Sequence, residues 1–289
     1  MVIAAAVCPW PPALAAELTG PDADIQRLRD ACAQAVGRLV RTRPDLVAVI
    51  GPAQVTRTWA PDSRLDLSVF APAPGPASAL AGARSTGQSG ARSGDPALPP
   101  SLGIGALLLD QAGYRGPGRR VLQAVAEDEA PAACAELGAA IGSSSRRVGL
   151  LVMGDGSARR SPRAPGHLDP RAAAFDAGTE RALRQADFHA LLAMSPGMAS
   201  ELMATGRPAW QVLAGALRET RATTDVLYSD APFGVGYLVA YLQPAAEPTA
   251  AEPMAAEPTA AEPTAAEPTA GPPQPTARPA PAPGREASR

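Results

Sequence analysis

The sequence predicts an α/β fold, a single domain with a central mostly parallel or mixed sheet flanked by helices, followed by a disordered C-terminal tail. Short continuous apolar runs alternate with longer segments whose apolar residues recur every three or four positions. About 210 residues carry such patterns, which is enough for one sizeable core. Most of the remaining chain lies in two stretches rich in Ala and Pro, and the sequence has 33 prolines in all.

The strands are expected where the chain is apolar for a few residues or alternates: Val2–Val7, Leu46–Ile50, Leu65–Phe70, Val121–Val125, Val148–Met153, Thr224–Tyr228 and Val235–Leu242. Gly51-Pro52 is expected to end the second of them. The helices are expected where the spacing is helical: Asp22–Arg41, Leu102–Gln111, Pro131–Ile141, Pro170–Gln185, Phe188–Met194, Gly197–Met203 and Pro208–Leu217. The first helix shows the pattern best, with apolar residues at Ile25, Leu28, Cys32, Val36 and Leu39.

Two low-complexity segments interrupt or follow this domain. Residues 71–100 contain 23 Ala, Gly, Pro or Ser among 30 positions, and we interpret them as a loop inserted into a domain of residues 1–243. The alternative, a linker between two domains, leaves too few apolar segments before it for a core. Residues 244–289 include five pentads of the type AAEPT. Proline at every fifth position prevents a continuing helix, so a disordered tail is predicted, either inert or used for docking.

Composition excludes several classes of function. The net charge is −2, all 26 basic residues are arginine, and the chain has no asparagine. The absence of lysine excludes Schiff-base and P-loop chemistry, and no basic stripe suggests a nucleic acid partner. Three cysteines, an odd number, are typical of reduced thiols in a cytoplasmic protein. No apolar run is long enough for a membrane span, and the apolar N-terminus lacks the basic region of a signal peptide.

Ligands of open α/β sheets bind at the carboxyl ends of the strands, here in the loops after Val7, Ile50 and Met153. The candidate cleft residues in these loops are Cys8, Trp10, Gln54, Asp155, Ser157, Arg159 and His167. Cys8 is a ligand or nucleophile in this interpretation, whereas free cysteine more often packs as a small buried hydrophobe. His189 is expected on a helix surface.

The loop after Met153 is the richest in functional groups. Asp155, Ser157 and Arg159 could converge on a phosphate or carboxylate substrate. Alternatively, Asp155 caps a turn and the arginines of the loop pair with Asp169 and Asp176. The sequence leaves both interpretations open.

Three motifs together give a resemblance to a known family. They are GDGSARR at 154–160, APGHLDPRAAAFD at 164–176 and APFGVGYLVAY at 231–241. Their order is similar to that of the subunit-B-like superfamily of class III extradiol ring-cleavage dioxygenases, over most of residues 1–243. The resemblance implies a site in which two histidines and one carboxylate hold non-haem Fe(II) and another histidine acts as acid and base.

The positions that the resemblance assigns to this site carry other residues. Trp10 or Cys8 stands at the first ligand, Gln54 or its neighbours at the second, and Ala158 replaces the histidine of the loop. The family carboxylate falls near 204–206, which reads Ala-Thr-Gly, and His167 stands where tyrosine is usual.

We therefore expect a pseudoenzyme of this family with no metal site and no cofactor, which keeps a cleft for a small molecule or a partner. Two alternatives stay open: an enzyme of different chemistry that uses 154–160, or a non-catalytic interaction protein that acts through its tail. The sequence is compatible with a homo-oligomer or a hetero-oligomer in each of these three interpretations.

Overall fold

The computed structural model describes residues 1–15, 22–63, 97–114, 119–245 and 271. The expected strand Leu65–Phe70, most of the expected inserted loop and nearly all of the expected tail lie outside these residues. The observed elements are, in order, β1 (Val2–Cys8), η1 (Pro12–Leu14), α1 (Ala23–Arg41), β2 (Leu46–Ala53), β3 (Arg57–Trp59), α2 (Pro100–Gln111), β4 (Arg119–Ala126), α3 (Pro131–Ser143), β5 (Val148–Met153), α4 (Ala172–Arg184), α5 (Phe188–Leu192), α6 (Pro196–Glu201), α7 (Arg207–Leu217), β6 (Ala222–Asp230) and β7 (Tyr237–Pro244).

A mixed sheet forms the centre of the unit that contains residues 1–247. Its strand order within the described residues is β3-β4-β2-β5-β1-β7-β6. The four strands β4, β2, β5 and β1 are parallel, whereas β3, β7 and β6 run antiparallel to their neighbours. The predicted α/β fold class is confirmed.

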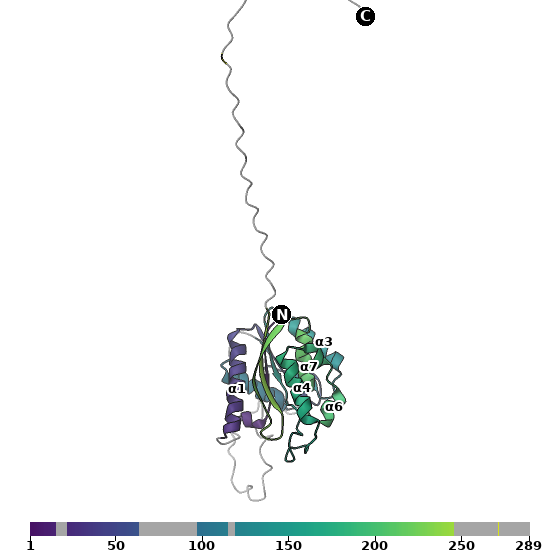
Figure 1. Ribbon diagram of the computed structural model, residues 1–289. Helices are drawn as coiled ribbons and strands as arrows, with labels where there is room; N and C mark the ends of the chain where they lie inside the picture. The colour runs from purple at the N-terminus through teal and green to yellow at the C-terminus, as the bar shows by residue number, and fades with distance from the viewer. Residues whose placement is uncertain (16–21, 64–96, 115–118, 246–270, 272–289) are drawn as a thin grey trace, which may run out of the picture. The chain divides into compact units, whose positions relative to one another are not determined.

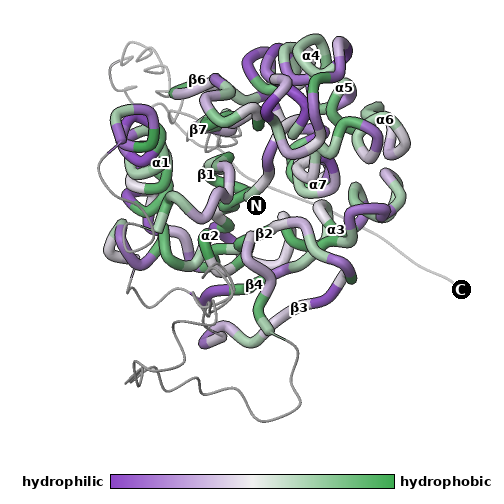
Figure 2. Tube along the Cα trace, turned by 90° about the horizontal axis from the view of Figure 1, so that it is seen from below, coloured by the Kyte–Doolittle hydropathy of each residue, from purple (hydrophilic) through white to green (hydrophobic). Residues whose placement is uncertain are grey.

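Helices cover both faces of the sheet. α1 and α2 lie on one face, and α3, α4, α5 and α7 lie on the other (Figures 1 and 2). Burial on both sides explains why β1, β2 and β5 are continuous apolar runs without alternation. No helix within the described ranges is both long enough and apolar enough to span a membrane.

α1 shows how the local sequence sets an element. Asp22 precedes the helix, and its carboxylate accepts hydrogen bonds from the N–H groups of Asp24 and Ile25 at 2.9 and 3.0 Å. This satisfies two of the donors that a helix start leaves unpaired. The apolar positions named for this helix from the sequence are all buried against the sheet.

The structure corrects two details of the expected elements. β2 continues through Gly51 and Pro52 to Ala53, because its backbone stays paired with β4 up to the Ala53–Ala126 pair. β3 is an additional strand: it has three residues, two of them exposed, and so carries no apolar pattern.

Glycine permits close packing of α3 on α7. A methyl group on Gly138 would lie 2.0 Å from the carbonyl oxygen of Val212, so Gly138→Ala requires the two helices to separate. We expect a loss of about 1–3 kcal/mol in the free energy of unfolding, measured by urea denaturation. Gly37→Ala in α1 is the control, since the nearest atom there is Arg41 Nη1 at 3.4 Å. It should raise stability by about 0.5–1 kcal/mol. Equal effects of the two substitutions would contradict this account.

Candidate functional site

The carboxyl ends of β1, β2, β4 and β5 meet at one edge of the sheet because these strands are parallel. β7 begins at the same edge because it is antiparallel to β1. The loops that follow β1 and β5 therefore lie beside the start of β7. This is the edge at which the sequence predicts the candidate site.

The loop Gly154–Arg160 is held by hydrogen bonds to two other segments. The N–H groups of Gly156 and Arg160 donate to the carbonyls of Gly236 and Gly234, at 2.7 and 3.0 Å. Gly236 N–H donates back to the Ser157 carbonyl at 2.9 Å. The first and third motifs of the sequence therefore contact each other directly.

The second motif joins the same cluster through Asp176. Its carboxylate accepts from Ser157 N–H at 2.8 Å and pairs with the Arg160 guanidinium at 2.7 Å. Burial raises the pKa of Asp176, and these two donors oppose that rise. Asp176 thus fixes the loop 154–160 by charge and by hydrogen bonding. Its ion pair with Arg160 agrees with the alternative in which arginines of the loop pair with Asp169 and Asp176.

Asp155, in the loop after β5, contacts both the loop after β1 and the residue before α7. Its Oδ1 accepts a hydrogen bond from Trp10 N–H at 2.9 Å, and its carbonyl accepts from Gly206 N–H at 2.9 Å. The residue is half-buried. Burial raises its pKa to about 7, although the Trp10 hydrogen bond favours the charged form. A carboxyl group at this pKa can both donate and accept a proton near neutral pH.

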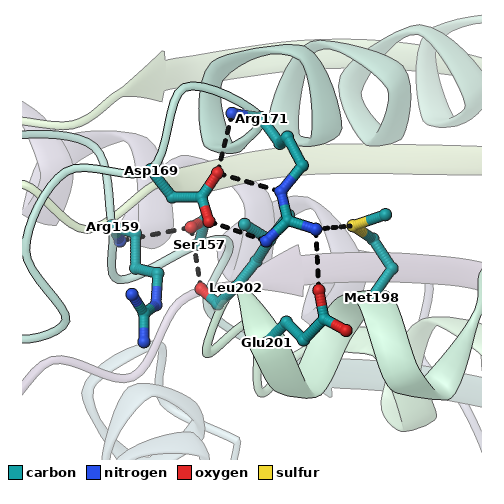
Figure 3. Close-up of polar contacts among 7 residues, drawn as sticks. All are labelled: Ser157, Arg159, Asp169, Arg171, Met198, Glu201 and Leu202. Carbon is teal, nitrogen blue, oxygen red and sulfur yellow. Dashed lines mark hydrogen bonds and ion pairs between the residues drawn. The ribbon is translucent and has the colours of Figure 1, made fainter.

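Ser157 is not available as a reacting group. It is fully buried, its hydroxyl donates to the Leu202 carbonyl at 2.8 Å, and it accepts from Arg159 N–H at 3.2 Å (Figure 3). Its role is to connect the loop to the end of α6. The alternative in which Ser157 acts on a substrate therefore has no support from its geometry.

The remaining predicted residues separate into two groups. Cys8 is fully buried and free, beside the Cys32 thiol, whose pKa burial raises. It therefore packs as a small hydrophobe. Gln54 and His167 are exposed. His167 has a positive φ of 58° and approaches the Pro162 carbonyl at 3.4 Å.

The arginines of this segment pair with Asp169 and Asp176, as one of the sequence alternatives expects. Arg160 binds Asp176, and Arg171 binds Asp169 at 2.8 Å. Arg171 also binds Glu201 at 2.7 Å, a partner that sequence reasoning missed. Arg159 forms no ion pair within the described residues.

The donor set does not fit the Fe(II) that the resemblance implies. An indole and an alanine at Trp10 and Ala158 provide no ligand, and Gln54 is exposed. His167 and His189 are both exposed on separate segments. In the part of the chain that the structure describes, no three His, Cys, Asp or Glu side chains are placed to hold a metal ion.

The surface of the described residues has one small cavity near the carboxyl edge of the sheet and one larger hollow away from it. A cavity of about 20 Å³ lies between Asp176, Trp210 and Tyr237, with room for about one water molecule. A hollow of about 520 Å³ lies near the amino ends of β2 and β4, lined in part by Leu46, Arg119 and Ile141.

No protein-family model matches the chain, and no curated protein matches it. Among solved structures it is similar to the crystal structure of uncharacterized protein JW3007 from Escherichia coli K12. The TM-score is 0.48 with 15% sequence identity, over 83% of this chain and 99% of that chain. This likeness is too distant to carry an argument about function.

Asp155 should make the stability of the protein depend on pH. Its pKa is 3.8 in an unfolded chain and about 7 in the folded protein. Its contribution is thus fully present below pH 3.8 and is lost as the pH rises to about 7, by at most about 1.4 kcal/mol per pH unit. Asp155→Asn stays neutral and keeps an acceptor for Trp10 N–H. The melting temperature of this variant minus that of the wild type should increase from about pH 4 to about pH 7, then stay constant. A difference independent of pH would show that Asp155 ionises normally.

Ser157→Ala should lower the free energy of unfolding by about 1–3 kcal/mol, because it removes one of the two hydrogen bonds to the Leu202 carbonyl and leaves Arg159 N–H without its partner. Urea denaturation measures this loss. Ser200→Ala is the control, since Ser200 is exposed, and it should change stability by less than about 0.5 kcal/mol. An unchanged stability of Ser157→Ala would contradict the structural role.

Proposed function

We propose that this chain is a member of the class III extradiol ring-cleavage dioxygenase superfamily that has lost the iron site and binds a small molecule beside Asp155. The observation that carries the proposal is Asp155 itself. It is a half-buried carboxyl group with a pKa of about 7 at the carboxyl edge of a parallel sheet. Strongly shifted carboxyl groups at such edges are typical of functional sites.

The contacts among the three motifs support the assignment to this superfamily. The first and third motifs are far apart in sequence, yet Gly156 N–H donates to the Gly236 carbonyl. Asp176 of the second motif binds both Ser157 and Arg160 of the first. The resemblance is thus concentrated in segments that build one site.

The absence of suitable ligands at the matched positions supports the loss of iron. Ring opening by this superfamily depends on open coordination positions on Fe(II) for substrate and dioxygen. Without that chemistry, the residues of this edge can still bind a polar ligand. Asp155 would exchange a hydrogen bond with a phenolic hydroxyl, next to Trp10, which is partly buried and binds Asp155 through its backbone N–H.

Catechol is the probe for this proposal. The full chain is incubated with Fe(II) without oxygen and desalted, and its iron content is measured; catechol and oxygen are then added and the absorbance of the ring-opened product is followed. We expect iron far below one atom per chain and no product. Stoichiometric iron with turnover of catechol would overturn the loss of the metal site.

Binding is measured separately by calorimetric titration of catechol into the metal-free protein. We expect wild-type binding and about tenfold weaker binding by Asp155→Asn, because the amide replaces a hydrogen bond to an ionisable group with a weaker, neutral one. Asp45→Asn is the matched control, because Asp45 is exposed just before β2 at the opposite edge of the sheet. No binding by the wild type, or equal affinities of wild type and Asp155→Asn, would overturn the site.

A further inference from the structure

A hollow of about 520 Å³ lies away from the candidate site, near the amino ends of β2 and β4. These two strands form its floor, and the last turn of α3 forms part of its wall. Figure 2 shows β3 and β4 at one end of the sheet with α3 beside β2. Sites for small organic molecules have volumes of about 300–1,000 Å³. The hollow therefore has the size of a ligand site.

Most of this hollow is lined by apolar side chains. Its apolar lining includes Leu46 and Ala48 of β2, Val121 of β4 and Ile141 of α3, and these residues belong to, or pack against, the core on this face of the sheet. Leu46 and Ala48 are two positions apart, so they point to the same side of β2. Protein interiors are close-packed, and an apolar space that stays empty costs stability. An apolar ligand would fill this space with favourable contacts.

The uncharged polar side chains of the lining bind other parts of the chain. The Thr58 hydroxyl donates to Gln123 Oε1 at 2.8 Å, and the Gln123 amide donates to the Ala124 carbonyl at 2.8 Å. The Ser144 hydroxyl donates to the Ile141 carbonyl at 2.6 Å. These groups therefore have partners without a ligand.

The two arginines of the lining differ in their partners. The Arg120 guanidinium binds the Asp110 carboxylate at 2.6 Å. Arg119 is exposed, and no carboxylate of the described residues lies within ion-pair distance of it. The lining, as far as the structure describes it, contains no Asp or Glu. The hollow is thus positively charged, and Arg119 is placed at its rim to bind an anion.

We propose that this hollow is a second binding site, which takes a small molecule with an apolar body and one carboxylate. The body fills the space between β2, β4 and α3, and the carboxylate binds Arg119. A carboxylate matches the single charge and the fork of N–H donors of one guanidinium. A small molecule fits better than a protein partner, because a stable protein interface buries about 800 Å² on each side.

The test titrates 2-naphthoate and 2-naphthamide into the full chain by calorimetry. The two probes share an aromatic body and differ in charge. We expect 2-naphthoate to bind at least about tenfold more tightly than 2-naphthamide, because the hydrogen bonds of Arg119 to a carboxylate are charge-assisted on both sides. Equal affinities, or no binding of either probe, would overturn the proposal.

Ala140→Trp tests the location of the site. Ala140 is exposed on α3 and lines the hollow, so an indole there takes up the space of the ligand. This variant should bind 2-naphthoate at least about tenfold more weakly than the wild type. Ala139→Trp is the matched control, since Ala139 is the adjacent exposed residue and lies outside the described lining. Its affinity should stay within about twofold of the wild type, and equal losses in the two variants would place the binding elsewhere.

Arg119→Gln tests the role of the charge. It should reduce the preference for 2-naphthoate over 2-naphthamide to less than about twofold. Arg163→Gln removes the same charge from an exposed residue in the loop after β5 and should keep the preference. A preference lost equally in both variants would come from overall charge and would contradict binding by Arg119. Circular dichroism and melting temperature check that all four variants fold.

Sedimentation velocity tests whether a second copy of the chain occupies the hollow instead. We expect the wild type and Ala140→Trp to sediment alike. Self-association that both 2-naphthoate and Ala140→Trp prevent would assign the hollow to a chain–chain interface and overturn the proposal. The inference goes beyond the proposed function and does not rest on it, because catechol and 2-naphthoate are titrated separately and either can fail to bind alone.

Discussion

The Asp176 carboxylate holds the candidate site together. It binds Ser157 N–H and the Arg160 guanidinium while lying against two glycines. A methyl group on Gly156 or Gly236 would lie 2.6 or 2.2 Å from its oxygens, so only glycine leaves room for it. This contact fixes the loop after β5 against α4 and β7, and it thereby determines where Asp155 and Arg159 point.

The polar groups at the carboxyl edge of the sheet differ in how many hydrogen-bond or ion-pair partners the fold gives them. Asp176 and Ser157 each bind two donor or acceptor groups of the fold, whereas, within the described residues, the Asp155 carboxylate has one partner and Arg159 has no carboxylate partner. Natural sequences keep such locally unfavourable arrangements mainly where function needs them. The contrast separates residues of this edge whose polar groups hold the loop in place from residues whose polar groups lack such a partner, although both kinds occur in the short loop 154–160.

Sequence patterns predicted the parallel core because burial on both faces leaves a direct signal. β5 has the predicted bounds, Val148–Met153, and the predicted apolar face of α1 is buried. β3 left no signal because it has three residues and depends on pairing with β4. The pairing of Arg171 with Glu201 could not be predicted either, since the two residues are 30 positions apart.

The candidate residues were predicted because they follow strands of the sheet. That criterion identifies residues of the carboxyl edge only where the loop after the strand folds back over this edge. Asp155 meets it because Trp10 N–H and Gly206 N–H both bind it. Gln54 fails because β2 continues past the expected end, so this residue extends into solvent before the chain enters β3. Sequence position therefore identifies the edge, while backbone hydrogen bonds across loops decide which side chains share it. By the same logic, the backbone at position 158 is held independently of its side chain, because Ala158 N–H donates to the Leu202 carbonyl.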